Sequence, residues 1–453
     1  MRKPHKTPIV KASPDIKVTE PRISKLVIFI CRLFGRLYLF LFYGIARIVV
    51  NGDGKNLFNA FKRALAGESR CIIAFRHPNG GEAQLLSWFF LFKLRVFAAR
   101  AGVKFPRWPH AVFVYGYEVV RWGGWVARFI MPNVGAMPIH HSKMDSKGMT
   151  RIQKAITEGP YPVAIAPEGQ VSYTTDAVPR LEPGVIRIGF QAVERLTGKN
   201  ETCSVEILPL SVHFRFGTWG TLTLERLLKK IEKICGFSGK DRKNIPFTER
   251  ARQCRDYILE ANEARYQINS EKTKPFEERL NLVINAALET AERMMGVKSE
   301  GDLFSRMYRM RQLCWDQIFI PGVENLENMP FIEQNIRHLK AGEAWYIGRH
   351  IELVDFCWYF RVPLPDEGTS LSSRVEYAQN LWDFANRTMG GAFSNRKNIL
   401  PRRVIIRAAP VINLSERFPA YQKDKKAAVA AAMSDLEKAY LDCIADANKA
   451  EQG

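Results

Sequence analysis

The sequence predicts an α/β fold, in which a mixed sheet flanked by helices is joined by an N-terminal helical segment and a large helical insertion. Short apolar runs alternate with amphipathic helical patterns over residues 51–223, as strands and helices do along an α/β domain. Long helical patterns with few strands occupy residues 224–398, and a strand pattern followed by a helical pattern returns within residues 399–453. These observations predict either one discontinuous α/β domain with an insertion or two consecutive domains.

The composition indicates an anionic partner and a reducing compartment. The 453 residues carry a formal net charge of +21, which favours nucleic acid, an anionic membrane or an acidic substrate. The sequence has no zinc-finger spacing and no RNA-binding signature, so we expect no nucleic-acid partner. The eight cysteines include no C-x-x-C pair, and we expect free thiols.

The first 50 residues predict a tail followed by a membrane-associated helix. Residues 1–24 are polar, basic and rich in proline, and we expect them to be disordered. Residues 25–50 are apolar and aromatic, but their charge-free run is shorter than the roughly 20 residues that span a bilayer. On a helical projection four basic side chains share one sector, as in a helix lying in a membrane interface: Lys25, Arg32, Arg36 and Arg47. The alternative is a helix packed on the protein's own core, with the basic stripe in water.

The stretch AFRHPNGGEAQLL, residues 74–86, places a histidine and a carboxylate five positions apart with two glycines between them. A strand pattern precedes it and a helical pattern follows it, so His77 and Glu82 are predicted to lie on a strand-to-helix turn. A histidine whose one ring nitrogen is fixed by a carboxylate can take a proton from a hydroxyl through its other nitrogen. The pair is therefore a candidate general base. The alternative is a surface histidine near a solvated glutamate.

Three further stretches follow in the chain: GAMPIHH (135–141), APEGQVS (166–172) and VEILPL (205–210). Together with HPNGGE they resemble, in order and spacing, the four motifs of the glycerolipid acyltransferases similar to 1-acylglycerol-3-phosphate acyltransferase. HPNGGE is a His-x4-Glu variant of that family's His-x4-Asp motif. The resemblance covers roughly residues 50–220 and, more faintly, 402–447, which in this family supply a last strand and helix. It therefore favours the helical insertion over two consecutive domains, and it implies an acyltransferase-like sheet.

The resemblance implies a membrane-associated O-acyltransferase, peripheral or monotopic, on the cytoplasmic face. A fatty acyl group would pass from an acyl-CoA or acyl carrier protein thioester to a hydroxyl of a lysophospholipid or glycerol-phosphate-type lipid. His77 would act as general base and Glu82 would orient it, without a cofactor, a metal or a covalent acyl-enzyme. Glu168 and Gly169 would help to bind the acceptor. Anionic membrane lipids would be partners of such an enzyme.

Two departures from the family pattern concern the acceptor's phosphate. The basic residue that ends the second motif is His141 rather than arginine, and Val171 replaces the arginine that follows the Pro-Glu-Gly motif. Arginine holds phosphate through two parallel hydrogen bonds, and valine cannot. We therefore expect phosphodiester or uncharged acceptors to be used at least as well as a phosphomonoester, unless other basic residues substitute. The candidates are Lys143, Arg180 and Arg187, the last two of which could instead belong to a solvated helix face.

Two rival functions are weighed against an acyltransferase. A serine or cysteine hydrolase is disfavoured because the sequence has no G-x-S-x-G elbow. A catalytically degenerate relative that binds lipids or acts as a scaffold remains the alternative, since three of the four motifs are altered. The presence of both His77 and a carboxylate at position 82 argues against that alternative.

Overall fold

A computed structural model gives the fold and describes residues 10–17, 19–52, 54–140, 145–217, 219–239, 241–366, 368–392, 396–397 and 401–452. The chain divides into two compact units. The sheet unit comprises Val18–Gly217 and Leu400–Gly453, and the helical unit comprises Met1–Lys17 and Thr218–Ile399. The chain thus leaves the sheet unit and later returns to it.

The sheet unit is built on a mostly parallel sheet with strand order β2-β9-β7-β3-β6-β4-β5, and a short strand β10 also pairs with β7. β9 and β10 run antiparallel to β7, and the other pairings are parallel. The strands are β2 (Ile45–Val50), β3 (Ser69–Phe75), β4 (Val112–Gly116), β5 (Met137–Ile139), β6 (Val163–Ile165), β7 (Ser204–Phe216), β9 (Arg402–Ala408) and β10 (Ile412–Asn413). The predicted α/β class with a mixed sheet is confirmed.

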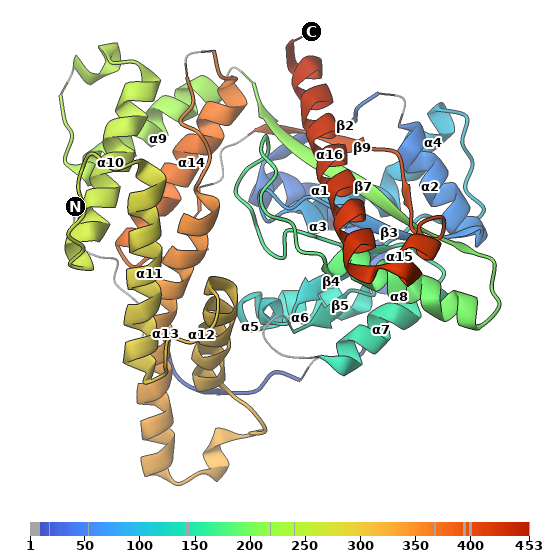
Figure 1. Ribbon diagram of the computed structural model, residues 1–453, viewed down its shortest axis with the longest axis horizontal. Helices are drawn as coiled ribbons and strands as arrows, with labels where there is room; N and C mark the ends of the chain where they lie inside the picture. The colour runs from blue at the N-terminus through green and yellow to red at the C-terminus, as the bar shows by residue number, and fades with distance from the viewer. Residues whose placement is uncertain are drawn as a thin grey trace. The chain divides into compact units, whose positions relative to one another are not determined.

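Helices cover both faces of this sheet, and alternating strand residues feed two separate cores. Ile73 and Phe75 of β3 pack with α2 (Lys55–Ala66), α3 (Glu82–Phe92) and α4 (Leu94–Arg100). Ile72 and Ala74 pack on the other face with α7 (Ser146–Glu158), α8 (Gly184–Gly198) and α16 (Lys425–Gln452). Figure 1 shows α16, in red, lying across the sheet. A strand buried on both faces explains the unbroken apolar run that ends at Phe75.

Four shorter or peripheral helices complete the sheet unit: α1 (Lys25–Tyr43), α5 (Glu118–Trp122), α6 (Gly124–Asn133) and α15 (Phe418–Lys423). The backbone N–H of Ser24, which caps α1, donates to the carbonyl of Asn133 at the end of α6 (2.8 Å). This bond places the start of α1 beside the end of α6.

The described residues of the helical unit form mainly six helices, together with a two-residue parallel strand pair. Its helices are α9 (Trp219–Cys235), α10 (Phe247–Arg265), α11 (Phe276–Met295), α12 (Leu303–Ile318), α13 (Phe331–Tyr359) and α14 (Leu371–Thr388), with 3-10 turns at Asp241–Asn244 and Leu326–Asn328. Buried carboxylates tie neighbouring helices together through arginines. Glu263 of α10, for example, is paired with Arg279 of α11.

Two expectations for the N-terminal 50 residues need correction. The tail expected over residues 1–24 is partly ordered, because β1 (Ser13–Pro14) pairs in parallel with β8 (Phe319–Ile320). Proline is tolerated at such a short edge pairing, and the long-range partner leaves no local sequence signal. The helix expected over residues 25–50 ends at Tyr43. Gly44 takes a left-handed conformation (φ 63°) that caps the helix, and the β-branched run after it forms β2.

Candidate active site

The sequence motifs meet at one edge of the sheet, where neighbouring parallel strands end. His77 follows β3, Glu168 follows β6, Tyr117 follows β4 and His140 follows β5. These four strands are parallel and adjacent in the order β3-β6-β4-β5, so their carboxyl ends share an edge. In open α/β sheets, ligands bind outside the carboxyl ends of the strands.

The His77–Glu82 pair forms directly across the turn between β3 and α3. His77 Nδ1 lies 2.7 Å from Glu82 Oε2, and the fully buried carboxylate also accepts the backbone N–H groups of Asn79 and Gly80, each at 2.8 Å. Gly80 supplies the left-handed backbone (φ 94°) that points these amides inward. Glu82 is also the first residue of α3, where the helix dipole favours a negative charge. The extra methylene of glutamate is thus accommodated without losing the hydrogen bond to His77.

The protonation of His77 follows from these contacts. Nδ1 donates to the carboxylate, which leaves Nε2 as the ring's acceptor, and the side chain is 20% exposed. Burial lowers the pKa of His77, but the hydrogen bond to Glu82 and the negative charges of Glu82 and Glu168 outweigh it. The pKa of His77 is therefore raised above its ordinary value, and the imidazole is a stronger base.

Glu168, which was expected to help bind an acceptor, is buried beneath the turn. Its side chain has no exposed surface; Oε1 accepts from Arg76 Nε and Oε2 accepts from the backbone N–H of His77, both at 2.9 Å. The carboxylate thus faces the protein and holds the backbone of His77. Gly169 is placed beside it in a turn (φ 73°), with its N–H donating to Ala166 O.

Sequence reasoning did not find Arg76, which organises the loop after β6. Its fully buried guanidinium donates to Glu168 and to three backbone carbonyls, those of Thr174, Thr175 and Ala177 (2.7–2.9 Å). Tyr440 of α16 donates a hydrogen bond to Ala74 O (2.9 Å). The end of β3 is therefore held both by the contacts of Arg76 and by α16. A local signal exists: an arginine at the end of an apolar strand needs a buried partner.

Two of the other expected acceptor-binding residues, Arg180 and Arg187, lie within the described part of the chain. Arg180 is exposed in the loop before α8, and Arg187 is exposed on α8. His141 and Lys143 lie outside the described residues, so the structure does not place them. The rings of His140 and Tyr117 stack with centroids 4.1 Å apart, and Arg121 lies over the Tyr117 ring.

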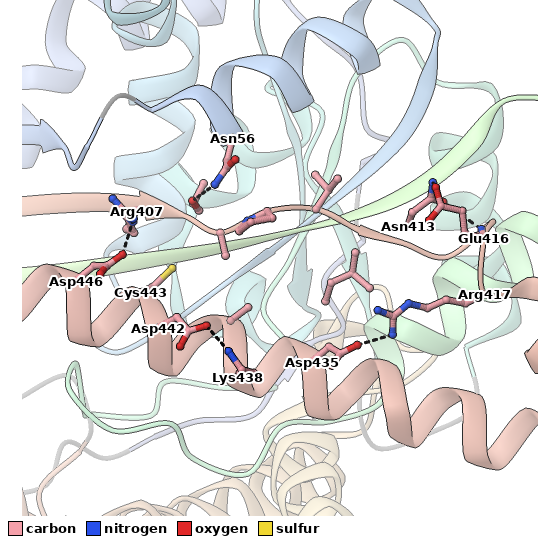
Figure 2. A pocket seen from close by; sticks show the side chains of 16 residues that line it. Asn56, Arg407, Asn413, Glu416, Arg417, Asp435, Lys438, Asp442, Cys443 and Asp446 are labelled. Atoms are coloured by element: carbon pink, nitrogen blue, oxygen red, sulfur yellow. Dashed lines mark hydrogen bonds and ion pairs between the residues drawn. The ribbon is translucent and has the colours of Figure 1, made fainter.

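A groove of about 380 Å³ lies elsewhere in the sheet unit, between the β9–β10 segment and α16 (Figure 2). Six of its charged side chains form ion pairs, Arg417 with Asp435, Lys438 with Asp442, and Arg407 with Asp446, and Glu416 accepts a hydrogen bond from Asn413. Its lining does not include His77, Glu82 or Glu168. Within the described part of the chain, no group of three or more His, Cys, Asp or Glu side chains is arranged to hold a metal ion.

Comparisons with protein-family models, with curated proteins and with solved structures found no match to this chain. The assignment of a function therefore depends on the geometry of the site and on the four sequence motifs.

Proposed function

We propose that the chain is an O-acyltransferase that moves a fatty acyl group from an acyl thioester to a hydroxyl of a lysophospholipid or a glycerol-phosphate-type lipid. The observation that carries the proposal is the His77–Glu82 pair, with its 2.7 Å hydrogen bond and a raised His77 pKa, at the carboxyl edge of a parallel sheet. The four acyltransferase-like motifs support it, since HPNGGE and APEGQVS follow strands that end at this edge, and GAMPIHH contains a third such strand, β5.

The proposed reaction is a direct transfer. His77 Nε2 takes the proton of the acceptor hydroxyl as its oxygen attacks the thioester carbonyl carbon. The carbon–sulfur bond then breaks, and the departing thiolate of CoA or acyl carrier protein recovers the proton from the imidazolium. Glu82 stabilises the imidazolium by charge and hydrogen bonding, while Glu168 holds the backbone of His77 in place.

The test is incubation of the purified protein with radiolabelled acyl-CoA and a panel of lysolipids, glycerol phosphate and uncharged glycerides. We expect the label to appear in the lipid product. Label in free fatty acid would indicate hydrolysis instead. Lysolipid binding without any product would favour the lipid-binding alternative.

Membrane association is part of this proposal, and the structure changes how it would occur. α1 is long and apolar enough to cross a membrane by length and composition. Arg36, however, points back to the protein, where it donates to the carbonyls of Ile45 and Ala46, and Arg32 lies over the ring of Phe92. Arg47 belongs to β2. Lys25, Arg32 and Arg47 are exposed, but Arg36 is turned to the protein and Arg47 lies outside the helix, so the four residues do not form one stripe along α1.

Apart from Lys25 and Arg32, the exposed residues of α1 are apolar or aromatic. They include Leu26, Phe29, Leu33, Phe34, Leu37, Leu41 and Phe42. On α6, which meets the start of α1, Trp125 is 77% exposed and Phe129 is 53% exposed. Aromatic side chains of this kind favour the headgroup region of a bilayer. We infer that α1 lies in the membrane surface with this apolar face toward the lipid.

Charges placed on the apolar face of α1 should release the protein from membranes. For the double substitution Leu33→Asp with Leu37→Asp, we expect at least a hundredfold weaker binding to anionic vesicles, because each buried leucine contributes roughly 1.5–3 kcal/mol. Co-sedimentation with vesicles measures the effect. The matched control is Leu222→Asp with Leu441→Asp, two leucines that are similarly exposed on other helices. Unchanged sedimentation of the α1 variant would place the anchor elsewhere.

The rate of transfer should depend on pH through His77. A general base must be unprotonated, so kcat/KM is expected to fall as the pH drops through the raised pKa of His77, which lies above the ordinary value of about 6.5. Glu82→Gln removes both the charge and the charged hydrogen bond, and should move this acidic limb to lower pH while slowing the reaction. The pH profile of kcat/KM measures both effects, with exposed Glu201→Gln as the control. An acidic limb that Glu82→Gln leaves unmoved would contradict the assignment of the base.

A further inference from the structure

Arg402, the first residue of β9, connects the end of α1 to the turn that carries His77. Its buried guanidinium donates to the carbonyl of Tyr43 through Nε (2.8 Å) and Nη2, and to Asn79 Oδ1 through Nη1 (2.9 Å). Its backbone N–H donates to Gly44 O (2.7 Å). One side chain therefore joins three segments that are far apart in the sequence.

Asn79 is directly connected to the His77–Glu82 pair. Its backbone N–H donates to Glu82 Oε1 (2.8 Å), and Glu82 Oε2 accepts from His77 Nδ1. A shift of Asn79 therefore changes the position of the carboxylate that orients the imidazole.

Tyr43 makes a second contact between α1 and the same turn. Its ring packs so closely on Gly81 that a Cβ atom at position 81 would lie 2.5 Å from Tyr43 Cδ1. Tyr38, five residues earlier and partly exposed, packs edge-on against the Tyr43 ring with centroids 5.7 Å apart. A continuous line of contacts thus runs from the apolar face of α1 to the loop of the general base.

α1 is weakly held by the protein itself, since Val27 and Leu39 are its only buried residues. A helix with so few buried contacts opens at low free-energy cost in water. Burying the exposed apolar face of α1 in a bilayer would fix the position of the helix. The carbonyl and ring of Tyr43, at the end of α1, would be fixed with it. The bilayer would then favour one geometry of the turn over others.

We propose that Arg402 is a positioning residue that couples the seating of α1 on a bilayer to the geometry of the His77–Glu82 pair. The inference rests on the proposed function and adds a regulation of that same site. The enzyme reaches its full rate only when α1 is docked, even toward acceptors and donors that are dissolved in water.

The first experiment measures acyl transfer between a short-chain acyl-CoA and a water-soluble acceptor, at nanomolar full-length protein, with and without anionic vesicles. We expect vesicles to raise kcat/KM by about 5-fold or more in the wild type. Arg402→Met should bind vesicles as the wild type does but lose most of this stimulation. Arg402→Lys, which keeps the charge and reaches one of the two acceptor groups, should retain part of it. Arg403→Met is the matched control, because Arg403 is the exposed neighbour on the same strand.

A second variant covers the case in which Arg402→Met does not fold. Asn79→Ala cuts the link between Arg402 and the turn but leaves Arg402 bonded to Tyr43, and the residue is only partly buried. The vesicle stimulation should fall with this variant too. Stimulation that persists in a folded Arg402→Met or Asn79→Ala protein would overturn the proposal, as would a wild-type rate that vesicles do not change.

A readout that needs no enzymatic activity separates this inference from the proposed function. The rate at which diethyl pyrocarbonate modifies His77, followed by mass spectrometry across a pH range, reports the pKa and access of the ring. We expect vesicles to shift this profile in the wild type and not in Arg402→Met, whereas a purely structural role of Arg402 would leave the vesicle-dependent shift intact. A vesicle-dependent profile in a protein that transfers no acyl group would sink the proposed function and leave the coupling standing. Acyl transfer without a vesicle-dependent shift would support the proposed function and overturn the coupling through Arg402.

Discussion

Replacing His77 by alanine is expected to lower acyl transfer by about 100-fold to 10,000-fold, the usual contribution of a general base. His77 Nε2 is the acceptor atom at the carboxyl edge of the sheet, and Glu82 raises its basicity. The loss should appear in kcat, since proton transfer occurs in the transition state, while KM for the acyl donor changes little. Initial rates with labelled acyl-CoA measure it.

Folding and membrane binding should survive this substitution. His77 is partly exposed, and α1 carries the membrane contacts that we propose. Thermal unfolding and vesicle co-sedimentation of His77→Ala check both points, with His338→Ala in the helical unit as a control histidine. A variant that keeps more than about a tenth of the wild-type rate would remove His77 from the mechanism.

Replacing Arg76 by methionine is expected to lower the free energy of unfolding by about 3–5 kcal/mol, because breaking a buried ion pair leaves a buried charge without compensation. Both Arg76 and Glu168 have no exposed side-chain surface, and Arg76 also satisfies three carbonyls of the loop after β6. Denaturant unfolding measures the change. Arg70→Met is the control, since Arg70 lies on the same strand and is partly exposed.

The partner substitution tests whether Glu168 supports the turn or binds the acceptor. If Glu168 supports the turn, adding Glu168→Gln to Arg76→Met should restore part of the lost stability, because no uncompensated charge remains. Glu168→Gln alone should lower kcat more than it raises KM for the acceptor. A large rise in acceptor KM with kcat unchanged would instead return Glu168 to the acceptor site.

Much of the sheet was predictable from the sequence because several of its strands are continuous apolar or β-branched runs. The apolar runs ending at Phe75 and Leu210, and the β-branched run after Arg402, have few stable alternatives to buried strands. The strand after Gly44 was not predictable, because the aromatic and aliphatic helix pattern runs up to that glycine without a break. The helix ends at Gly44, a single residue in the left-handed conformation, and a strand begins directly after it.

The site was predictable where its contacts are short in sequence. His77 and Glu82 are five residues apart, and the glycines between them indicate a tight turn. The roles of Glu168 and Arg402 depend on partners 91 to 359 residues away, which no local pattern encodes. The hydrogen bonds of Arg36 could not be predicted for the same reason, because they depend on how α1 packs on β2.

The separation of these partners sets an order for the synthesis of the chain. Arg402 bonds to Tyr43 across 359 residues, and Tyr440 bonds to Ala74 across 366 residues. At about 5–20 residues per second, a ribosome needs roughly 20–70 s to make the distant partner after the first has emerged. The nascent protein can therefore present α1 to a membrane long before the strand and helix that brace the His77 turn exist. Under the proposed function, anchoring would precede catalytic competence, and a ribosome that stalls before residue 402 would leave a chain whose α1 can bind a membrane but whose His77 turn is not braced.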